Sequence, residues 1–409
     1  MSGDPFFEML ATDDPVPILQ RLRATDPVHR VEPLGFWLVT RHDDIKTLFH
    51  DPEQRVSPDK RLWSSYVPPP EGSLLRWADD HGMMALSPQD HARVRRLVSA
   101  AFTPRAVRRM ENQIREVVDR VAAPLRNRSG EVLDLFADFT QIVPNSVISR
   151  ITGVPPGDDE ERFRELSQSV ISAFVPFTPP DLQKQAEASF QELSVWVREL
   201  VAKRRTTPEE DLITDLVHAE DADDRLNEDD IVLLLTGIVG AGTETTALGG
   251  ATIIRMLLGL PEAAARLRAD PPLIHRSINE ILRYAFVSPA GPQRYAVRDF
   301  ELRGSRVCEG DMLMLALGGA NYDPAVYPNP DRLDFDRDVR DFATFGSGPH
   351  YCLGANLARC EIGCMVEALL EILPPGSRVR EDQIEYQDAG FFRRALDLPV
   401  EVGPAPAGA

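Results

Sequence analysis

A glycine-bearing loop that leads directly into an apolar helix is the feature that most limits how this chain can fold. The segment FGSGPHYCLG runs from Phe345 to Gly354, and ANLARCEIGCMVEALLEIL follows it with helical periodicity. Two glycines two residues apart permit a tight turn with positive φ. At the start of the helix, Cys352 lies near free backbone N–H groups and the positive end of the helix dipole, which stabilise a thiolate. The pattern predicts a metal ligand or a catalytic nucleophile.

The residues alone leave the role of Cys352 open, because a buried structural cysteine is the third alternative. A nucleophile needs a base within reach, and His350 could supply it. Cys360 and Cys364 lie four residues apart on the following helix, where we expect them to pack as small apolar side chains. With Cys308 the chain has four cysteines in 409 residues, too few for a disulfide framework. This usage fits a reducing, cytoplasmic location.

A long apolar helix is predicted from about 227 to 259. Its interior contains five glycines, at 237, 240, 242, 249 and 250. Each costs roughly 1 kcal/mol relative to alanine in a helix interior, so a flat ligand or another helix must lie close to its backbone. Ala241-Gly242-Thr243-Glu244-Thr245-Thr246 places an acid and hydroxyls on this helix. Glu244 either handles protons or faces solvent, because ionised glutamate is rarely buried without a function. The uncharged apolar stretch 231–243 is shorter than the roughly 20 residues that span a bilayer.

Two charged motifs each allow a structural and a functional explanation when they are considered alone. Glu280 and Arg283 lie three residues apart on one face of a predicted helix, where an isolated pair is usually a weak surface ion pair. The segment 91–110 holds six arginines and no acid, in a chain of formal charge −19. This reversal of sign indicates an anion-binding segment or a solvated basic helix. Within it, His91 and Arg95 share a helix face.

The composition excludes some classes of protein. A charge of −19 argues against nucleic-acid binding, and 43% hydrophobic residues argue against disorder. No repeat or linker divides the chain, so we expect one domain over 1–409 with a frayed tail at 403–409. The expected fold is mainly α with small β-sheets. We expect helices at about 91–101, 105–128, 131–152, 159–173, 181–204, 209–219, 227–259, 272–285 and 353–373, and strands at 28–40, 293–303, 311–317 and 396–402.

In this order and spacing the motifs resemble those of the cytochrome P-450 family, in particular its soluble bacterial members. The cysteine-loop pattern Phe-Gly-x-Gly-x-His-x-Cys-x-Gly is complete at 345–354, and the family's Glu-x-x-Arg is Glu280 to Arg283. Its oxygen-binding helix motif is Ala241 to Thr245. The resemblance covers nearly the whole chain. Further matches are LRYAFVSPAGPQRYA with Arg294, the meander GANYDPAVYPNPDRLDFDR at 319–337, and HARVRRLVSAAFTPR at 91–105.

The resemblance implies haem b between the 227–259 helix and the Cys352 loop with its proximal helix, with Cys352 as the axial thiolate of the iron. It places Glu280 and Arg283 in a buried structural network with the meander. The chain departs from the family at Phe342, where His is common, and at Tyr322, where Arg is common. The other implied cofactor-binding residues are His91, Arg95, Arg294 and His350 at the propionates, Ala241 and Gly242 against the porphyrin, and Phe345, Gly346 and Gly354 in the loop.

By the same resemblance the chain is a monooxygenase that uses O2 and two electrons to hydroxylate or epoxidise a hydrophobic small molecule, such as a terpenoid, steroid, fatty acid or polyketide. Thr245 would hold a proton-donating water and Glu244 would feed protons to it. Electrons would come from NAD(P)H through a ferredoxin reductase and a ferredoxin. We expect a monomer that binds neither membrane nor nucleic acid. The expected substrate pocket comprises Trp63, Tyr66, Met84, Phe174, Leu235, Ile238, Val287, Ala290, Phe391 and Phe392.

Three other classes stay open on the residues. A haem peroxygenase and a non-catalytic haem-thiolate sensor are both expected to lack the acid and alcohol pair, which is intact at Glu244 and Thr245. A cysteine hydrolase of unrelated fold would bind no haem.

Overall fold

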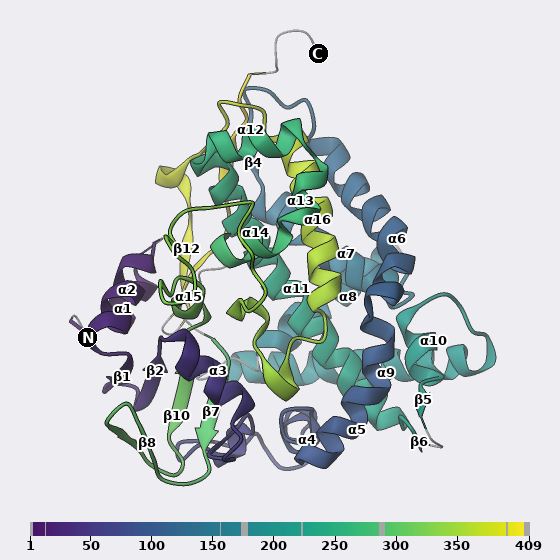
Figure 1. Ribbon diagram of the computed structural model, residues 1–409. Helices are drawn as coiled ribbons and strands as arrows, with labels where there is room; N and C mark the ends of the chain where they lie inside the picture. The colour runs from purple at the N-terminus through teal and green to yellow at the C-terminus, as the bar shows by residue number, and fades with distance from the viewer. Residues whose placement is uncertain are drawn as a thin grey trace. The chain divides into compact units, whose positions relative to one another are not determined.

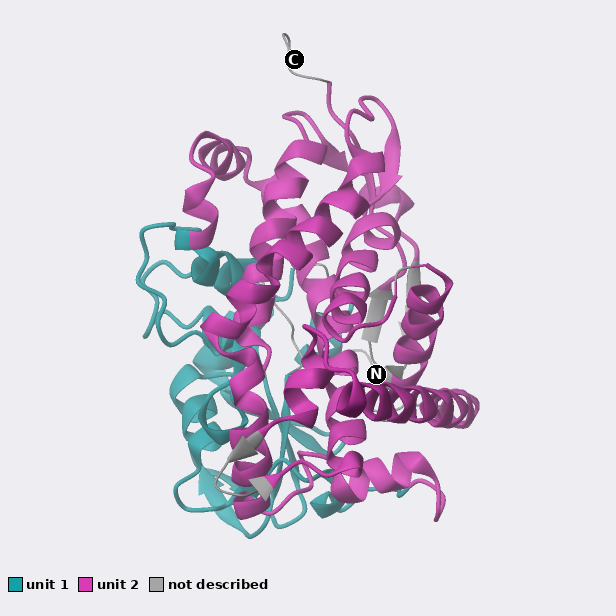
Figure 2. Ribbon diagram, turned by 90° about the vertical axis from the view of Figure 1, so that its right-hand side faces the viewer, with its two compact units in different colours: residues 1–68, 276–352, 391–393 teal, residues 69–275, 353–390, 394–409 magenta. Residues whose placement is uncertain are grey.

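The computed structural model describes residues 3–12, 14–155, 157–172, 179–221, 224–285, 291–389 and 392–404. The chain divides into two compact units (Figure 2). Unit 1 comprises residues 1–68, 276–352 and 391–393, and unit 2 comprises 69–275, 353–390 and 394–409. Each unit combines segments that are distant in the sequence, so neither folds from one continuous stretch.

Unit 1 is built on a five-stranded sheet of order β1-β2-β10-β7-β3 (Figure 1). β10 runs parallel to β2 and antiparallel to β7. The strand pair expected at 28–40 is confirmed, because β1 and β2 pair antiparallel. The strands are β1 Val28–Val31, β2 Phe36–Val39, β3 Val56–Ser57, β7 Gln293–Ala296 and β10 Met312–Leu315, with a separate hairpin of β8 Phe300–Leu302 and β9 Ser305–Val307.

Helices bury both faces of this sheet. Met312 and Met314 belong to a core that includes Phe6 of α1. Leu313, which points to the other face, belongs to a core that includes Leu48 of α3. All four residues of β10 are therefore buried. The helices of unit 1 are α1 Pro5–Leu10, α2 Val16–Thr25, α3 His42–His50, η1 Lys60–Leu62, α14 Ile278–Ala285, α15 Leu317–Asn321, η5 Ala343–Phe345 and η6 Gly348–His350.

Unit 2 is mainly helical, and α11 is its central helix. α11 spans Glu228–Gly259 and contacts α7, α8, α9 and α16 (Figure 1). The other helices are α4 Leu74–His81, α5 Pro88–Ser99, η2 Ala100–Phe102, α6 Pro104–Ala122, η3 Ala123–Leu125, η4 Phe136–Thr140, α7 Ile142–Ile151, α8 Asp158–Ser172, α9 Pro180–Thr206, α10 Leu212–Val217, α12 Pro261–Ala269, α13 Pro272–Arg276, α16 Ala355–Ile372 and η7 Glu381–Gln383.

Small sheets complete the fold. β4, β14 and β11 form a three-stranded sheet in the order β11-β14-β4, and Gly403 after β14 donates its N–H to the Ser377 hydroxyl. Gly403 is thus not part of a frayed tail, whereas 405–409 lie outside the described residues. The expected class, mainly α with small sheets, is confirmed. The remaining strands are β4 Val132–Asp134, β5 Glu220–Asp221, β6 Asp224–Arg225, β11 Arg378–Val379, β12 Tyr386–Ala389, β13 Phe392–Ala395 and β14 Pro399–Glu401.

The helix predicted at 131–152 is wrong only at its start, over about 131–135, because helical structure begins at Phe136. Leu133 pairs with Val400 in the three-stranded sheet, so β4 replaces the first helical turn. The Asp134 carboxylate then accepts hydrogen bonds from the N–H groups of Phe136 and Ala137 at 3.1 and 3.2 Å, which starts the π-helical η4. The helix predicted at 272–285 is two helices, α13 and α14. The sequence did not predict α1 to α4, α12 or α15.

The start of α11 shows why its boundaries were predictable. Asn227 and Asp230 form a reciprocal capping box, with bonds of 2.8 and 3.1 Å. Three acids in the first turn favour the positive end of the dipole. Within the described part of the chain, α11 is the one helix long and apolar enough to cross a membrane, but half of its most apolar window is buried in the protein. Buried core helices have the same composition.

Candidate active site

In unit 1 the Cys352 loop is fixed against the end of α3. Its glycines Gly346 and Gly348 have φ of 68° and 71°, as the pattern predicted. A Cβ atom at Gly346 would lie 3.4 Å from the Phe49 ring, and one at Gly348 would lie 2.6 Å from the Phe49 carbonyl oxygen. The Cys352 N–H donates to the Phe345 carbonyl at 2.9 Å and closes the loop. Cys352 is exposed and precedes α16 by three residues.

Side chains also hold this loop. His50 Nε2 lies 2.7 Å from Ser347 Oγ, so α3 and the loop share a hydrogen bond. The rings of Phe342 and Phe345 pack edge to face at 5.5 Å, and Phe345 and Tyr351 do so at 6.3 Å. At Phe342, where the family often has His, the chain therefore has aromatic packing instead of a polar donor.

Arg294 is a buried cation that lies beside Phe49, the residue against which the Cys352 loop packs. It lies on β7, is 4% exposed, and donates from Nη1 to the Gln293 carbonyl at 2.9 Å. Its guanidinium stacks 5.0 Å from the Phe49 ring centre. Burial lowers the pKa of Arg294 to about 10, an effect that Tyr295 and Asp51 partly offset. Because a carboxylate would stabilise this buried charge, Arg294 fits the implied propionate contact.

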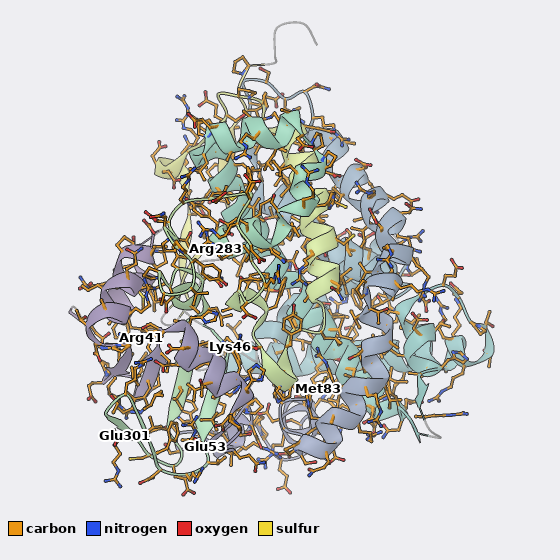
Figure 3. The ribbon with its side chains drawn as sticks, in the orientation of Figure 1. Arg41, Lys46, Glu53, Met83, Arg283 and Glu301 are labelled. Atoms are coloured by element: carbon orange, nitrogen blue, oxygen red, sulfur yellow. The ribbon has the colours of Figure 1, made fainter. Side chains whose placement is uncertain are left out.

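Glu280 and Arg283 lie at the centre of a buried network in unit 1, and Figure 3 labels Arg283 among the loops of the meander. Arg283 Nε and Nη2 donate to the two Glu280 oxygens at 2.6 and 2.8 Å. Arg283 Nη1 also donates to the carbonyls of Asn321 and Pro330, at 2.9 and 2.8 Å. Arg337 Nε donates to Glu280 at 3.2 Å. Glu280 and Arg283 are at most 1% exposed. The pair is therefore buried, and the alternative of a weak surface ion pair is excluded.

The second departure, Tyr322, lies in the same network. Its ring centre is 5.4 Å from the Arg283 guanidinium, and Tyr327 lies at 5.3 Å. The Tyr322 hydroxyl donates to the Tyr284 carbonyl at 2.7 Å. Burial raises the pKa of both Tyr322 and Tyr327 above its usual value. At position 322, where the family often has Arg, this chain therefore has an aromatic ring in contact with Arg283.

In unit 2, α5 turns His91 inward. Ser87 caps the helix by accepting from the Asp90 N–H at 3.1 Å, and Pro88 begins it. His91 is 4% exposed. Burial, followed by the charge of Arg95, lowers the pKa of His91, so a neutral imidazole is favoured. Arg93 points elsewhere and lies 3.3 Å from Asp230 of α11.

One face of α11 is exposed although the helix is mostly buried. Gly237, Ala241, Thr245 and Leu248 recur at helical spacing along this stripe and are exposed. Thr245 Oγ1 donates to the Ala241 carbonyl at 2.6 Å, which leaves its lone pairs to accept a hydrogen bond. Glu244 is partly exposed. The small residues Gly237, Ala241 and Thr245 of this stripe suit contact with a flat group.

Other glycines of α11 serve helix packing. A Cβ atom at Gly242 would lie 3.1 Å from Ile148 of α7. One at Gly250 would lie 2.8 Å from Met365 and 2.9 Å from Thr140. Close packing against neighbouring helices therefore accounts for Gly242 and Gly250, and the cofactor role of Gly242 stays a prediction.

The predicted pocket residues have varied surroundings. Leu235 is 1% exposed and belongs to the protein core, whereas Ile238 is partly exposed. Met84 is 54% exposed. Trp63 packs against the core that contains Phe6. Phe174, Val287, Ala290 and Phe391 lie outside the described residues, as does the side chain of Phe392.

These observations fit the haem that the resemblance implies. In unit 1 the exposed Cys352 thiol and the buried Arg294 guanidinium suit an iron ligand and a partner for an anion. In unit 2 the exposed stripe of α11 suits a flat group. Among the residues with described positions, no group of three or more His, Cys, Asp or Glu side chains could hold a metal ion. Haem brings most ligands of its iron, so a single protein thiolate suffices.

Comparison with known proteins agrees with this class. The family model for Cytochrome P-450 matches residues 36–373. The chain is 34% identical over 390 residues to the mycinamicin IV hydroxylase/epoxidase of Micromonospora griseorubida, with 93% of each chain covered. It is 30% identical over 403 residues to the polyketide biosynthesis cytochrome P-450 PksS of Bacillus subtilis, covering 95% of this chain and 96% of the relative. The solved structure of epothilone D-bound cytochrome P-450 epoK matches with a TM-score of 0.85 and 30% identity, covering 99% of this chain and 100% of that one.

The mainly helical fold and the cysteine-loop motif agree with the matched family. The chain belongs to the cytochrome P-450 family and is a monooxygenase of that family. Membership implies that it binds haem and uses O2.

Sequence reasoning missed the residues that support the Cys352 loop. Phe49 and His50 are almost 300 residues away along the chain, and no local pattern links them to it. Asn321 accepts from the Ala343 N–H at 2.7 Å and donates to the Thr344 hydroxyl at 2.8 Å. The meander motif contains Asn321, and its polar side chain in an apolar stretch was the available signal.

Proposed function

We propose that this monooxygenase hydroxylates or epoxidises a polyketide-like hydrophobic molecule, with Cys352 as the thiolate ligand of haem iron. The observation that carries the proposal is the exposed Cys352 thiol, held by the Gly346 and Gly348 turns directly before α16. The haem supplies the oxygen-activating chemistry. The names of two relatives, the mycinamicin IV hydroxylase/epoxidase and the polyketide biosynthesis cytochrome P-450 PksS, support the reaction type and the substrate class.

The residues around the haem would have separate tasks. Arg294 and His350 of unit 1, and His91 and Arg95 of unit 2, would bind the propionates as donors. Phe345, Gly346 and Gly354 would shape the loop. Ala241 would allow α11 to lie against the porphyrin.

Protons would pass along α11. The Thr245 hydroxyl donates to Ala241, so its oxygen would accept a hydrogen bond from a water and keep that water in place. Glu244, next to it and partly exposed, would transfer protons from solvent to this water. A ferredoxin would supply electrons, and the cytoplasm would be the site of action.

Spectroscopy of cysteine variants tests the iron ligand. The reduced carbon monoxide complex of the wild type should show the strongly red-shifted Soret band of thiolate ligation, and Cys352→Ser should lose it. Cys308→Ser and Cys360→Ser are the matched controls and should keep it. A Cys352→Ser protein that retains the band would disprove the assignment.

Coupling of electron use to product tests the proton path. In Thr245→Ala we expect NAD(P)H consumption to yield hydrogen peroxide in place of product, because the water would lose its acceptor. Thr252→Ala is the matched control, since Thr252 Oγ1 donates to the Gly249 carbonyl of the same helix at 2.8 Å. The relay would be refuted if both variants couple as well as the wild type.

A further inference from the structure

His50, the last residue of α3, is joined to the Cys352 loop by a side-chain hydrogen bond within unit 1. Its Nε2 atom lies 2.7 Å from Ser347 Oγ. Ser347 stands inside the stretch that the Cys352 N–H closes by donating to the Phe345 carbonyl at 2.9 Å. The bond therefore connects α3 to the middle of the loop, five residues before the cysteine.

The Ser347 hydroxyl bonds to α3 instead of capping its own helix. Ser347 is the N-cap of η6, a position where a serine hydroxyl usually accepts from a backbone N–H of the first turn. Here it makes no capping hydrogen bond. Its partner is His50, 297 residues away along the chain. The bond is therefore a contact between two distant segments and no consequence of the local turn.

Backbone contacts beside this bond are close but do not by themselves orient the loop. A Cβ atom at Gly348 would lie 2.6 Å from the Phe49 carbonyl oxygen and 3.4 Å from His50 Cα, so no side chain fits between the loop and α3. Such van der Waals contacts have no preferred direction, whereas a hydrogen bond is sensitive to both distance and angle. The bond between His50 and Ser347 can therefore fix the loop where packing alone cannot.

α3 is a fixed support because its first residue is anchored as well. The His42 N–H donates to the Asp323 carboxylate at 3.1 Å, and His42 Nε2 lies 2.8 Å from the Asp341 carbonyl oxygen. Lys46 Nζ donates to the Asp341 carboxylate at 2.9 Å. His42 and Asp323 are both less than 9% exposed. The helix is thus held at one end by buried polar contacts and presents His50 at the other.

We infer that His50 is a positioning residue that, through Ser347, keeps the Cys352 loop in the conformation that presents the thiolate. The inference rests on the proposed role of Cys352 as the iron ligand. Residues that orient a metal ligand tune the metal site without touching the metal. Without this bond the loop opens more often, which exposes the Cys352 sulfur to protonation by solvent.

The lifetime of thiolate ligation in the haem-loaded protein tests this. The red-shifted Soret band of the reduced carbon monoxide complex is followed over time in urea below the unfolding transition. His50→Ala and Ser347→Ala should each speed its loss about fivefold, which corresponds to one net hydrogen bond of about 1 kcal/mol. The double variant should be no faster than either single variant, because the second substitution removes the partner of a bond already lost.

Two further variants separate positioning from a general loss of stability. His50→Gln keeps a side-chain amide that reaches Ser347, and it should restore most of the wild-type lifetime. Thr47→Ala is the matched control, since Thr47 is exposed on α3 and its hydroxyl donates to the Asp43 carbonyl of the same helix at 2.8 Å. It should keep the wild-type lifetime. Global unfolding by circular dichroism should differ little among all variants, because the bond is at least partly exposed.

Several outcomes would overturn the inference. A band that persists as long in His50→Ala as in the wild type would show that His50 does not position the loop. Additive effects of His50→Ala and Ser347→Ala, or no rescue by His50→Gln, would show that His50 does not act through Ser347. These results would leave the ligand assignment intact, because Cys352→Ser tests whether the band exists and these variants test how long it lasts. A wild type without the band would refute the ligand assignment and this inference with it.

Discussion

The two tyrosines that flank Arg283 have the same ring contact but different hydroxyl environments. Tyr322 donates to the Tyr284 carbonyl at 2.7 Å, whereas the buried Tyr327 hydroxyl has no hydrogen-bond partner in the described structure. Tyr322→Phe should lower the free energy of unfolding by about 1 kcal/mol, because it leaves a carbonyl unpaired. Tyr327→Phe should be neutral or stabilising, since it removes a buried, unpaired hydroxyl. Urea unfolding of both variants measures the difference. Equal losses would mean that the hydroxyl bond contributes nothing.

Single residues also mark the limit of sequence reasoning. Glu280 and Arg283 were recognisable because their partnership is local, three residues apart on one helix. The tyrosine contacts were not, because Tyr322 and Arg283 are 39 residues apart in the sequence and meet only in the folded unit 1. The same holds for Phe49 beneath Gly346 and Gly348.

Among helices, α11 offers a direct test of why glycine occurs in an apolar core helix. A side chain at Gly250 would meet Met365 at 2.8 Å and Thr140 at 2.9 Å, whereas nothing lies within 4 Å of a Cβ atom at Gly237. Gly250→Ala should therefore destabilise the protein by about 1–3 kcal/mol through overpacking, reduced by the gain in helix propensity. Gly237→Ala should stabilise it by about 0.5–1 kcal/mol. Thermal unfolding of the two variants measures both changes in stability. If both substitutions stabilise the protein, Gly250 is only loosely packed against α16 and η4.

The contrast between α11 and the 131–152 segment shows which elements a sequence can predict. α11 has a capping box, an acidic first turn and a long apolar run, so local signals define both its existence and its first residue. The 131–152 segment has helical periodicity as well, but Leu133 pairs with Val400, and this long-range contact overrides local propensity. Two of the helices that were missed, α1 and α15, have only six and five residues and are too short for a periodic signal.

For the molecule as a whole, charge distribution bears on the choice of redox partner. The net charge is −19, yet Arg96, Arg105, Arg108 and Arg109 are exposed on α5 and α6. Arg93 of α5 is only partly exposed and lies 3.3 Å from Asp230, so it contributes less positive charge to this surface. Arg109 lies 3.4 Å from Asp215 and, with Arg96, lines a cavity of about 770 Å³ between α5, α6 and α10. The exposed arginines remain a positive surface on unit 2 to which an acidic ferredoxin would be attracted.

Electron transfer measured against ionic strength tests this surface. Arg96→Glu and Arg109→Glu should each slow ferredoxin-supported haem reduction, while substrate affinity and peroxide-driven turnover stay unchanged. The wild-type rate should fall as salt shortens the Debye length below its value of about 8 Å at physiological ionic strength. Breaking the exposed Arg109–Asp215 pair contributes little to any loss, because such pairs contribute less than about 1 kcal/mol. Arg340→Glu is the matched control, since Arg340 is an exposed arginine of unit 1 outside the basic segment, with an 86% exposed side chain. If all four proteins reduce at the same rate at every salt concentration, the ferredoxin docks elsewhere.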